Sequence, residues 1–221
     1  MARLGPVVTL AAGGIIAVSL GVMSATGATP AADTTAAEVA APREAEATTQ
    51  ATPEPEPAET ADPTPARADY AGRVKGNGAL MAVSIRKGKA IGYFCDGKIE
   101  AWFAGTAKNG KVALKGFGDA TATARLGGGK ASGDVELHGK KWSFVAPAVK
   151  KPSGLYRASA IVRGARIKAG WIVLDNGYQV GYAAADDRQI PTPTLRPGTD
   201  PTIDGTRVDA KDVDEFIEEL S

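Results

Sequence analysis

The chain has 221 residues and an almost balanced charge, with 26 lysines and arginines against 25 aspartates and glutamates. Its single histidine, His138, excludes a metal site built from several histidines. Its single cysteine, Cys95, lies far from the leading apolar segment and therefore excludes a lipoprotein.

The first predicted element is an apolar helix over residues 7–23. At ~1.5 Å per residue it is about 26 Å long, just enough to span a bilayer. Arg3 precedes it and no charge follows before Asp33, which favours a cytoplasmic amino terminus and an exported remainder. Small residues also fit signal-peptidase cleavage near residue 27–28. Residues 1–28 thus predict either a retained signal anchor in the cell membrane or a cleaved signal peptide of a secreted protein.

Residues 29–68 form a predicted disordered linker rich in alanine, threonine, proline and glutamate. The segment has seven prolines and no aromatic residue, so little apolar surface offsets the entropy of ordering it. It carries eight acidic and two basic residues. We expect it to act as an acidic stalk.

Residues 69–188 predict one basic, all-β domain, with twenty basic and nine acidic residues. Short alternating runs are separated by turn signals such as Asp96-Gly97 and Asn109-Gly110, which favour hairpins. We expect an antiparallel meander that closes as an up-and-down barrel or packs as a sandwich. The predicted strands cover residues 70–75, 80–86, 90–95, 98–104, 111–115, 121–126, 132–138, 141–146, 154–162, 167–174 and 178–183.

Residues 189–221 form an acidic tail with eight acidic and three basic residues. Val213, Phe216, Ile217 and Leu220 recur at helical spacing and predict a short amphipathic helix over residues 209–220, with Asp209 as its N-cap. Its apolar stripe needs a surface, either on the chain's own domain or on a protein partner.

A basic domain between acidic arms has three interpretations. It attracts an anionic partner, such as anionic lipid or a wall polymer; it presents a solvated surface that protects sheet edges; or the acidic arms fold back and screen it. A nucleic-acid partner is not expected, because basic residues are not interleaved with aromatic residues on one face.

Catalytic motifs are scarce, and we expect no cofactor and no metal. His138 is predicted to face solvent, and Cys95 to be a buried small residue at a strand end. An enzyme using a Cys95–His138 pair is supported only by the presence of both residues. The loop at Gly127–Lys130 lacks the spacing of a phosphate-binding loop.

Five short segments carry a family resemblance: Tyr-Phe-Cys-Asp-Gly at 93–97, Glu-Ala-Trp at 100–102, Gly-Leu-Tyr-Arg at 154–157, Gly-Trp-Ile-Val-Leu at 170–174 and Gln-Val-Gly at 179–181. Together they resemble an uncharacterised family of exported, membrane-tethered β-domain proteins of actinobacteria, over roughly residues 70–181. The resemblance implies architecture and an envelope location, and no activity.

Aromatic residues with a few polar groups suit the mouth of a ligand site. The candidate ligand-binding residues are Tyr93, Glu100, Trp102, Tyr156, Arg157 and Trp171. Core packing and one Arg–Glu pair would explain the same residues.

The sequence therefore favours a non-enzymatic cell-envelope protein with a binding or sensing β-domain outside the membrane. The alternatives are a β-barrel that binds a small apolar or amphipathic ligand and, third, an envelope enzyme that uses Cys95 and His138.

Overall fold

A computed structural model describes residues 63–220. The predicted apolar helix and residues 29–62 of the predicted linker lie outside the described residues. Among residues 63–220, no helix is both long enough and apolar enough to span a membrane.

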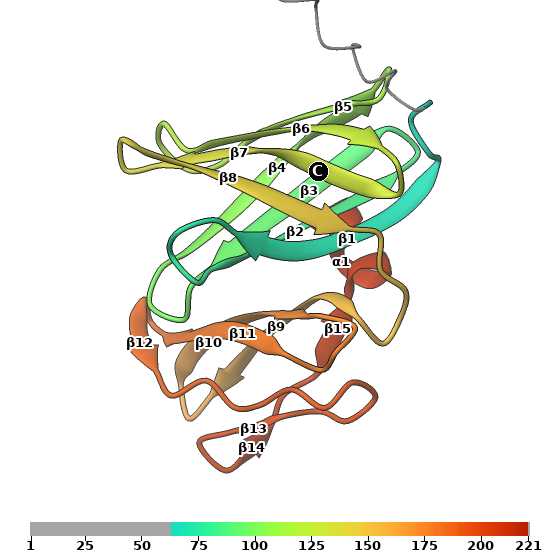
Figure 1. The fold of residues 1–221 in the computed structure, drawn as a ribbon. Coiled ribbons are helices and arrows are strands. Elements are labelled where there is room, and N and C mark those ends of the chain that lie inside the picture. Colours follow the sequence, from blue (N-terminus) through green and yellow to red (C-terminus); the bar gives the residue numbers. More distant parts are fainter. Residues whose placement is uncertain (1–62, 221) are drawn as a thin grey trace, which may run out of the picture. The chain divides into compact units, whose positions relative to one another are not determined.

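The first eight strands form a closed barrel in which each strand pairs antiparallel with the next (Figure 1). The barrel closes where β8 pairs with β1, through Arg73 opposite Val145 and Val74 opposite Phe144. The predicted up-and-down barrel is thus confirmed for this part of the chain. Its strands are β1 (Arg67–Val74), β2 (Leu80–Arg86), β3 (Lys89–Cys95), β4 (Glu100–Lys108), β5 (Lys111–Lys115), β6 (Thr121–Gly127), β7 (Lys130–Leu137) and β8 (Lys140–Pro147).

Alternation along each strand fills the barrel with apolar side chains. In β7, Val135 and Leu137 point inward while Asp134 and Glu136 point outward, as the sequence predicts. Four large inward side chains, Met81, Phe94, Phe103 and Phe144, are each at most 2% exposed. The interior is therefore a packed core, as is usual for eight-stranded barrels of this width.

Three glycines allow neighbouring barrel strands to approach closely. A Cβ on Gly72, Gly105 or Gly133 would lie 2.1, 2.1 or 1.9 Å from a carbonyl oxygen of a neighbouring strand. No side chain fits there, so glycine is required for the local bend of the strand.

The remaining strands form a second, five-stranded sheet in the order β12-β11-β10-β9-β15. The sequence predicts the strands β9 to β11 but places them in one meander with the preceding strands; the barrel instead closes without them. The predicted domain boundary after Arg188 falls inside β12. The bounds are β9 (Gly154–Val162), β10 (Ala165–Val173), β11 (Gln179–Ala185), β12 (Arg188–Ile190) and β15 (Ala210–Asp212), and a separate hairpin joins β13 (Thr202–Ile203) to β14 (Thr206–Arg207).

The C-terminal helix α1 (Val213–Leu220) begins later than the sequence predicts. Ala210–Asp212 pairs with β9 instead of extending the helix, and Asp209 is not the N-cap. The N-cap is Asp212: its Oδ1 accepts a hydrogen bond from the Asp214 amide at 2.9 Å, and its own amide donates to Glu215 Oε1 at 3.2 Å. The two bonds resemble a capping box, except that the Asp212 side chain accepts from the second helical amide rather than the third.

The helix and the second sheet pack against the outside of the barrel. Val213, Phe216 and Ile217 join a buried cluster with barrel residues such as Leu80 and Ile91. Leu155 and Ile172 of the second sheet complete that cluster. The apolar stripe of the helix is therefore covered by the chain's own domain, and β2 is buried on both faces.

Candidate functional site

The six candidate residues do not form one mouth. Tyr93, Glu100, Trp102 and Arg157 meet at the junction between the barrel and the second sheet. Tyr156 and Trp171 lie opposite each other in register and belong to a buried cluster on the other face of the second sheet. The six residues are therefore divided between two places.

The junction is organised around the carboxylate of Glu100. The Tyr93 hydroxyl donates to Glu100 Oε2 at 2.7 Å, and Trp102 Nε1 donates to the same oxygen at 3.2 Å. The two rings pack with centroids 4.2 Å apart. Burial raises the pKa of Glu100 and raises that of Tyr93 well above its usual value. Gly170 makes room for these rings, since a Cβ there would lie 2.6 Å from Tyr93.

Arg157 closes the junction from the second sheet. Its guanidinium lies 5.9 Å from the ring centroid of Trp102 and 6.0 Å from that of Phe216. Its ion pair is with Glu219 of the helix, at 3.3 Å, and not with Glu100. The contacts of all four junction residues are those of a packed interface with internal hydrogen bonds, and only Glu100 also borders a small hollow, of about 300 Å³.

Cys95 and His138 lie in different surroundings. Cys95 is buried in the cluster between the barrel, the second sheet and the helix, and burial raises the pKa of its thiol to about 11. His138 is exposed in the β7–β8 turn, where its φ is 52°. A thiol with so high a pKa is protonated at neutral pH and is a weak nucleophile.

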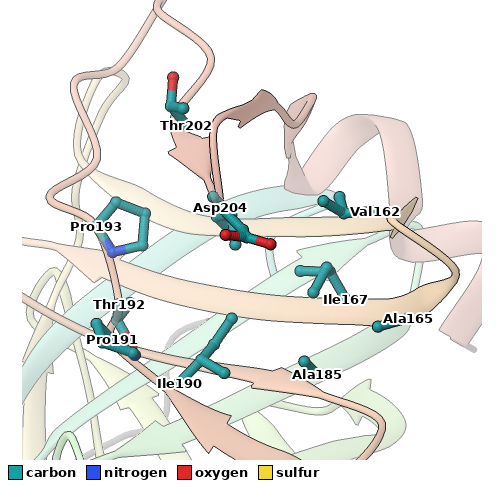
Figure 2. Close-up of a pocket in the computed structure, with 11 residues that line it drawn as sticks. Val162, Ala165, Ile167, Ala185, Ile190, Pro191, Thr192, Pro193, Thr202 and Asp204 are labelled. Carbon is teal, nitrogen blue, oxygen red and sulfur yellow. The ribbon is translucent and has the colours of Figure 1, made fainter.

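An apolar pocket lies on the second sheet and shares no lining residue with the junction (Figure 2). We call it the apolar pocket; its volume is about 480 Å³. Val162, Ile167 and Ile203, each at most 3% exposed, are its most buried side chains. The other lining residues are Ala165, Ala185, Ile190, Pro191, Thr192, Pro193, Thr202 and Asp204.

Side chains of β10 and β11 hold residues 193–195, next to one wall of the apolar pocket, through hydrogen bonds. Trp171 Nε1 donates to the Pro193 carbonyl oxygen at 2.9 Å. The Gln179 side chain bonds both backbone groups of Leu195, accepting from its amide at 2.8 Å and donating to its carbonyl at 2.9 Å. Trp171 is therefore not a lining residue but supports the wall through this hydrogen bond.

This pocket is not predicted from the sequence, because the acidic composition of residues 189–221 indicates a tail rather than part of a sheet. One signal was present. Asp204-Gly205 has the same turn chemistry as the barrel hairpins, and both residues have positive φ, 50° and 77°. That turn joins β13 to β14 and brings Ile203 to the pocket.

Acidic residues of the C-terminal segment pair with cations of the barrel and of the loop between β8 and β9. Asp214 contacts Arg67, Arg86 and Lys151, and Glu218 lies 2.5 Å from Lys89. Burial alone would raise the pKa of Asp214, but hydrogen bonds from Lys151 and Arg86 outweigh it and lower that pKa well below its usual value. The acidic tail thus folds back on the basic domain, one of the three interpretations of the charge pattern.

Within residues 63–220, no three histidine, cysteine, aspartate or glutamate side chains are grouped to hold a metal ion. Comparisons of the chain with protein-family models, curated proteins and solved structures found no match.

Proposed function

We propose that the chain is a non-enzymatic binding protein of the cell envelope, and that it binds a small apolar or amphipathic ligand in the apolar pocket of its second sheet. The envelope location is supported by the apolar run at residues 7–23 and the proline-rich linker that follows it. The observation that carries the binding role is a pocket of ligand size whose wall is already hydrogen-bonded in place.

The dimensions and chemistry of the pocket favour such a ligand. Small-molecule sites are typically ~300–1,000 Å³, mostly apolar, with a few polar groups that fix orientation. Here aliphatic side chains and two prolines supply the apolar surface, and Thr192, Thr202 and Asp204 supply the polar groups. The barrel interior is filled by its own side chains, so the proposal assigns the ligand to the second sheet.

The test is a fluorescence titration of the full chain, in an uncharged detergent, with N-phenyl-1-naphthylamine, an uncharged apolar probe. Ala185→Phe places a ring in the pocket and is expected to weaken probe binding at least tenfold. Ala148→Phe is the matched control, because Ala148 is exposed and does not line the pocket. Equal probe binding by the wild type and Ala185→Phe would refute the pocket as the binding site.

A further inference from the structure

Three basic residues stand side by side on the outside of the barrel. Lys108 on β4 is opposite Lys111 on β5, which is opposite Arg125 on β6. Their chain neighbours Ala107, Val112 and Ala124 are buried inside the barrel, so the three cations point outward. We call Lys108, Lys111 and Arg125 the basic row.

The basic row lowers the stability of the barrel when nothing neutralises its charges. Like charges directly opposite each other on neighbouring strands destabilise a sheet. None of the three forms an ion pair with another residue of the described chain, whereas the helix carboxylates pair with Arg67, Arg86 and Lys89 on β1 to β3. Carboxylates therefore neutralise the cations on β1 to β3, whereas the basic row has no carboxylate partner among the described residues.

A hollow of about 350 Å³ lies beside the basic row on β5, β6 and β7. Lys111 and Arg125 border it together with the hydroxyl-bearing residues Thr123 and Ser132, and Ser132 lies opposite Arg125 in register. The one carboxylate at this hollow is that of Asp134, which accepts a hydrogen bond from the Ser143 hydroxyl at 2.8 Å and lies 3.5 Å from Lys141. Its charge is thus already engaged.

We propose that the basic row and its hollow bind a phosphate group. Arginine offers a planar fork of donors that matches phosphate oxygens, lysine offers a mobile point charge, and hydroxyls supply further donors. This combination occurs here around a concave surface.

The position of the chain entry makes a lipid headgroup the favoured source of that phosphate, a choice that rests on the proposed membrane tether. Thr64 Oγ1 accepts a hydrogen bond from the Gly110 amide at 2.8 Å, and the Ala66 carbonyl accepts one from the Lys87 amide at 2.7 Å. The chain that leads from the amino terminus therefore reaches the barrel beside the turn between Lys108 and Lys111. The basic row therefore lies at the end of the barrel to which the linker attaches.

The experiment measures binding of soluble probes to the full chain in an uncharged detergent by calorimetry. The probes are dihexanoyl phosphatidylglycerol, dihexanoyl phosphatidylcholine and inorganic pyrophosphate. We expect phosphatidylglycerol to bind more tightly than phosphatidylcholine, with an affinity that falls as salt is raised. If only pyrophosphate binds, the site binds phosphate but its ligand is soluble rather than a lipid. If none of the three probes binds, the proposal is overturned.

Lys111→Glu is the decisive variant. It places a carboxylate opposite Arg125, so we expect the melting temperature to stay equal or rise while phosphate affinity falls tenfold or more. The double variant Lys111→Gln/Arg125→Gln is expected to lose affinity similarly. Arg188→Gln/Arg207→Gln is its control, because both arginines are exposed and its change in net charge is the same. Equal losses in the two double variants would show a general charge effect and overturn the site. The apolar probe of the pocket is uncharged, so its result is independent of this one.

Discussion

The side chains of Arg86 and Asp214 meet where the barrel contacts the C-terminal helix, with Arg86 Nε donating to Asp214 Oδ1 over 2.6 Å. The Arg86 side chain is only 10% exposed, and its Nη2 donates to Asp69 Oδ2 at 2.9 Å. One residue of the acidic tail thus completes the pairing of a nearly buried barrel cation.

Asp214→Asn is expected to lower the free energy of unfolding by about 1.5–3 kcal/mol at pH 7, because hydrogen bonds to charged groups contribute roughly that much. The folded pKa of Asp214 lies below its unfolded pKa. Its contribution is therefore complete above about pH 4 and is lost as the pH falls toward the folded pKa. Urea unfolding from pH 7 to pH 2 should show the wild type and the variant converging in acid. Asp209→Asn, at an exposed position outside the helix, should show no such difference.

Gly133→Ala is expected to destabilise the barrel by about 3 kcal/mol, the upper end for inserting a methyl group into a packed site. Its Cβ would lie 1.9 Å from the Thr123 carbonyl oxygen, and a backbone atom cannot rotate away. Gly127→Ala is the matched control, since nothing lies within 4 Å of a Cβ there. Urea denaturation measures both, and equal stabilities would contradict the close strand approach.

Trp171→Phe is expected to loosen the wall of the apolar pocket, because it removes the hydrogen bond to the Pro193 carbonyl. Amide hydrogen exchange at Leu195 should accelerate, and the affinity for N-phenyl-1-naphthylamine should fall several-fold, with a stability loss of about 1 kcal/mol. Trp142→Phe, inside the barrel, changes stability without touching this wall. If both variants bound the probe equally well, the supporting role of Trp171 would be wrong.

Phe216→Ala is expected to cost about 3 kcal/mol, because the ring is 1% exposed and its removal leaves a cavity. It also uncovers Trp102, whose ring centroid lies 5.9 Å from that of Phe216, so tryptophan emission should shift to longer wavelength. Phe117→Ala is the control, since Phe117 is 99% exposed. An unchanged melting temperature in Phe216→Ala would show that the helix does not dock on its own domain.

The strands of the barrel could be predicted because their signals are local. Alternation and turns such as Asn109-Gly110 identify each strand from its own residues. Closure after β8 could not be predicted, because no local signal states which strand pairs with β1. The start of α1 is a similar case: residues 210–212 are strand because β9 offers them an edge.

The sequence could have shown that the six candidate residues do not share one mouth, but it could not have located the apolar pocket. Tyr156 and Arg157 are consecutive in β9, so alternation directs them to opposite faces, and one mouth could not contain both. The grouping of Tyr93, Glu100 and Trp102 is also local, since β3 and β4 pair with Tyr93 opposite Trp102. The apolar pocket depends on contacts between β10 and residues 190–204. The Asp204-Gly205 turn predicts a hairpin in that segment, but no short-range pattern states which strand the segment packs against.

The pairing of β15 with β9 fixes when the second sheet can be completed during synthesis. Residues 154–162 leave the ribosome before residues 210–212, so this flank of β9 has no strand partner until β15 has also been synthesised. The eight barrel strands meet no such delay, since all of them precede β9. A chain that stops short of Ala210 would leave residues 156–158 of β9 unpaired on that side, an exposed strand edge of the kind that pairs with other chains.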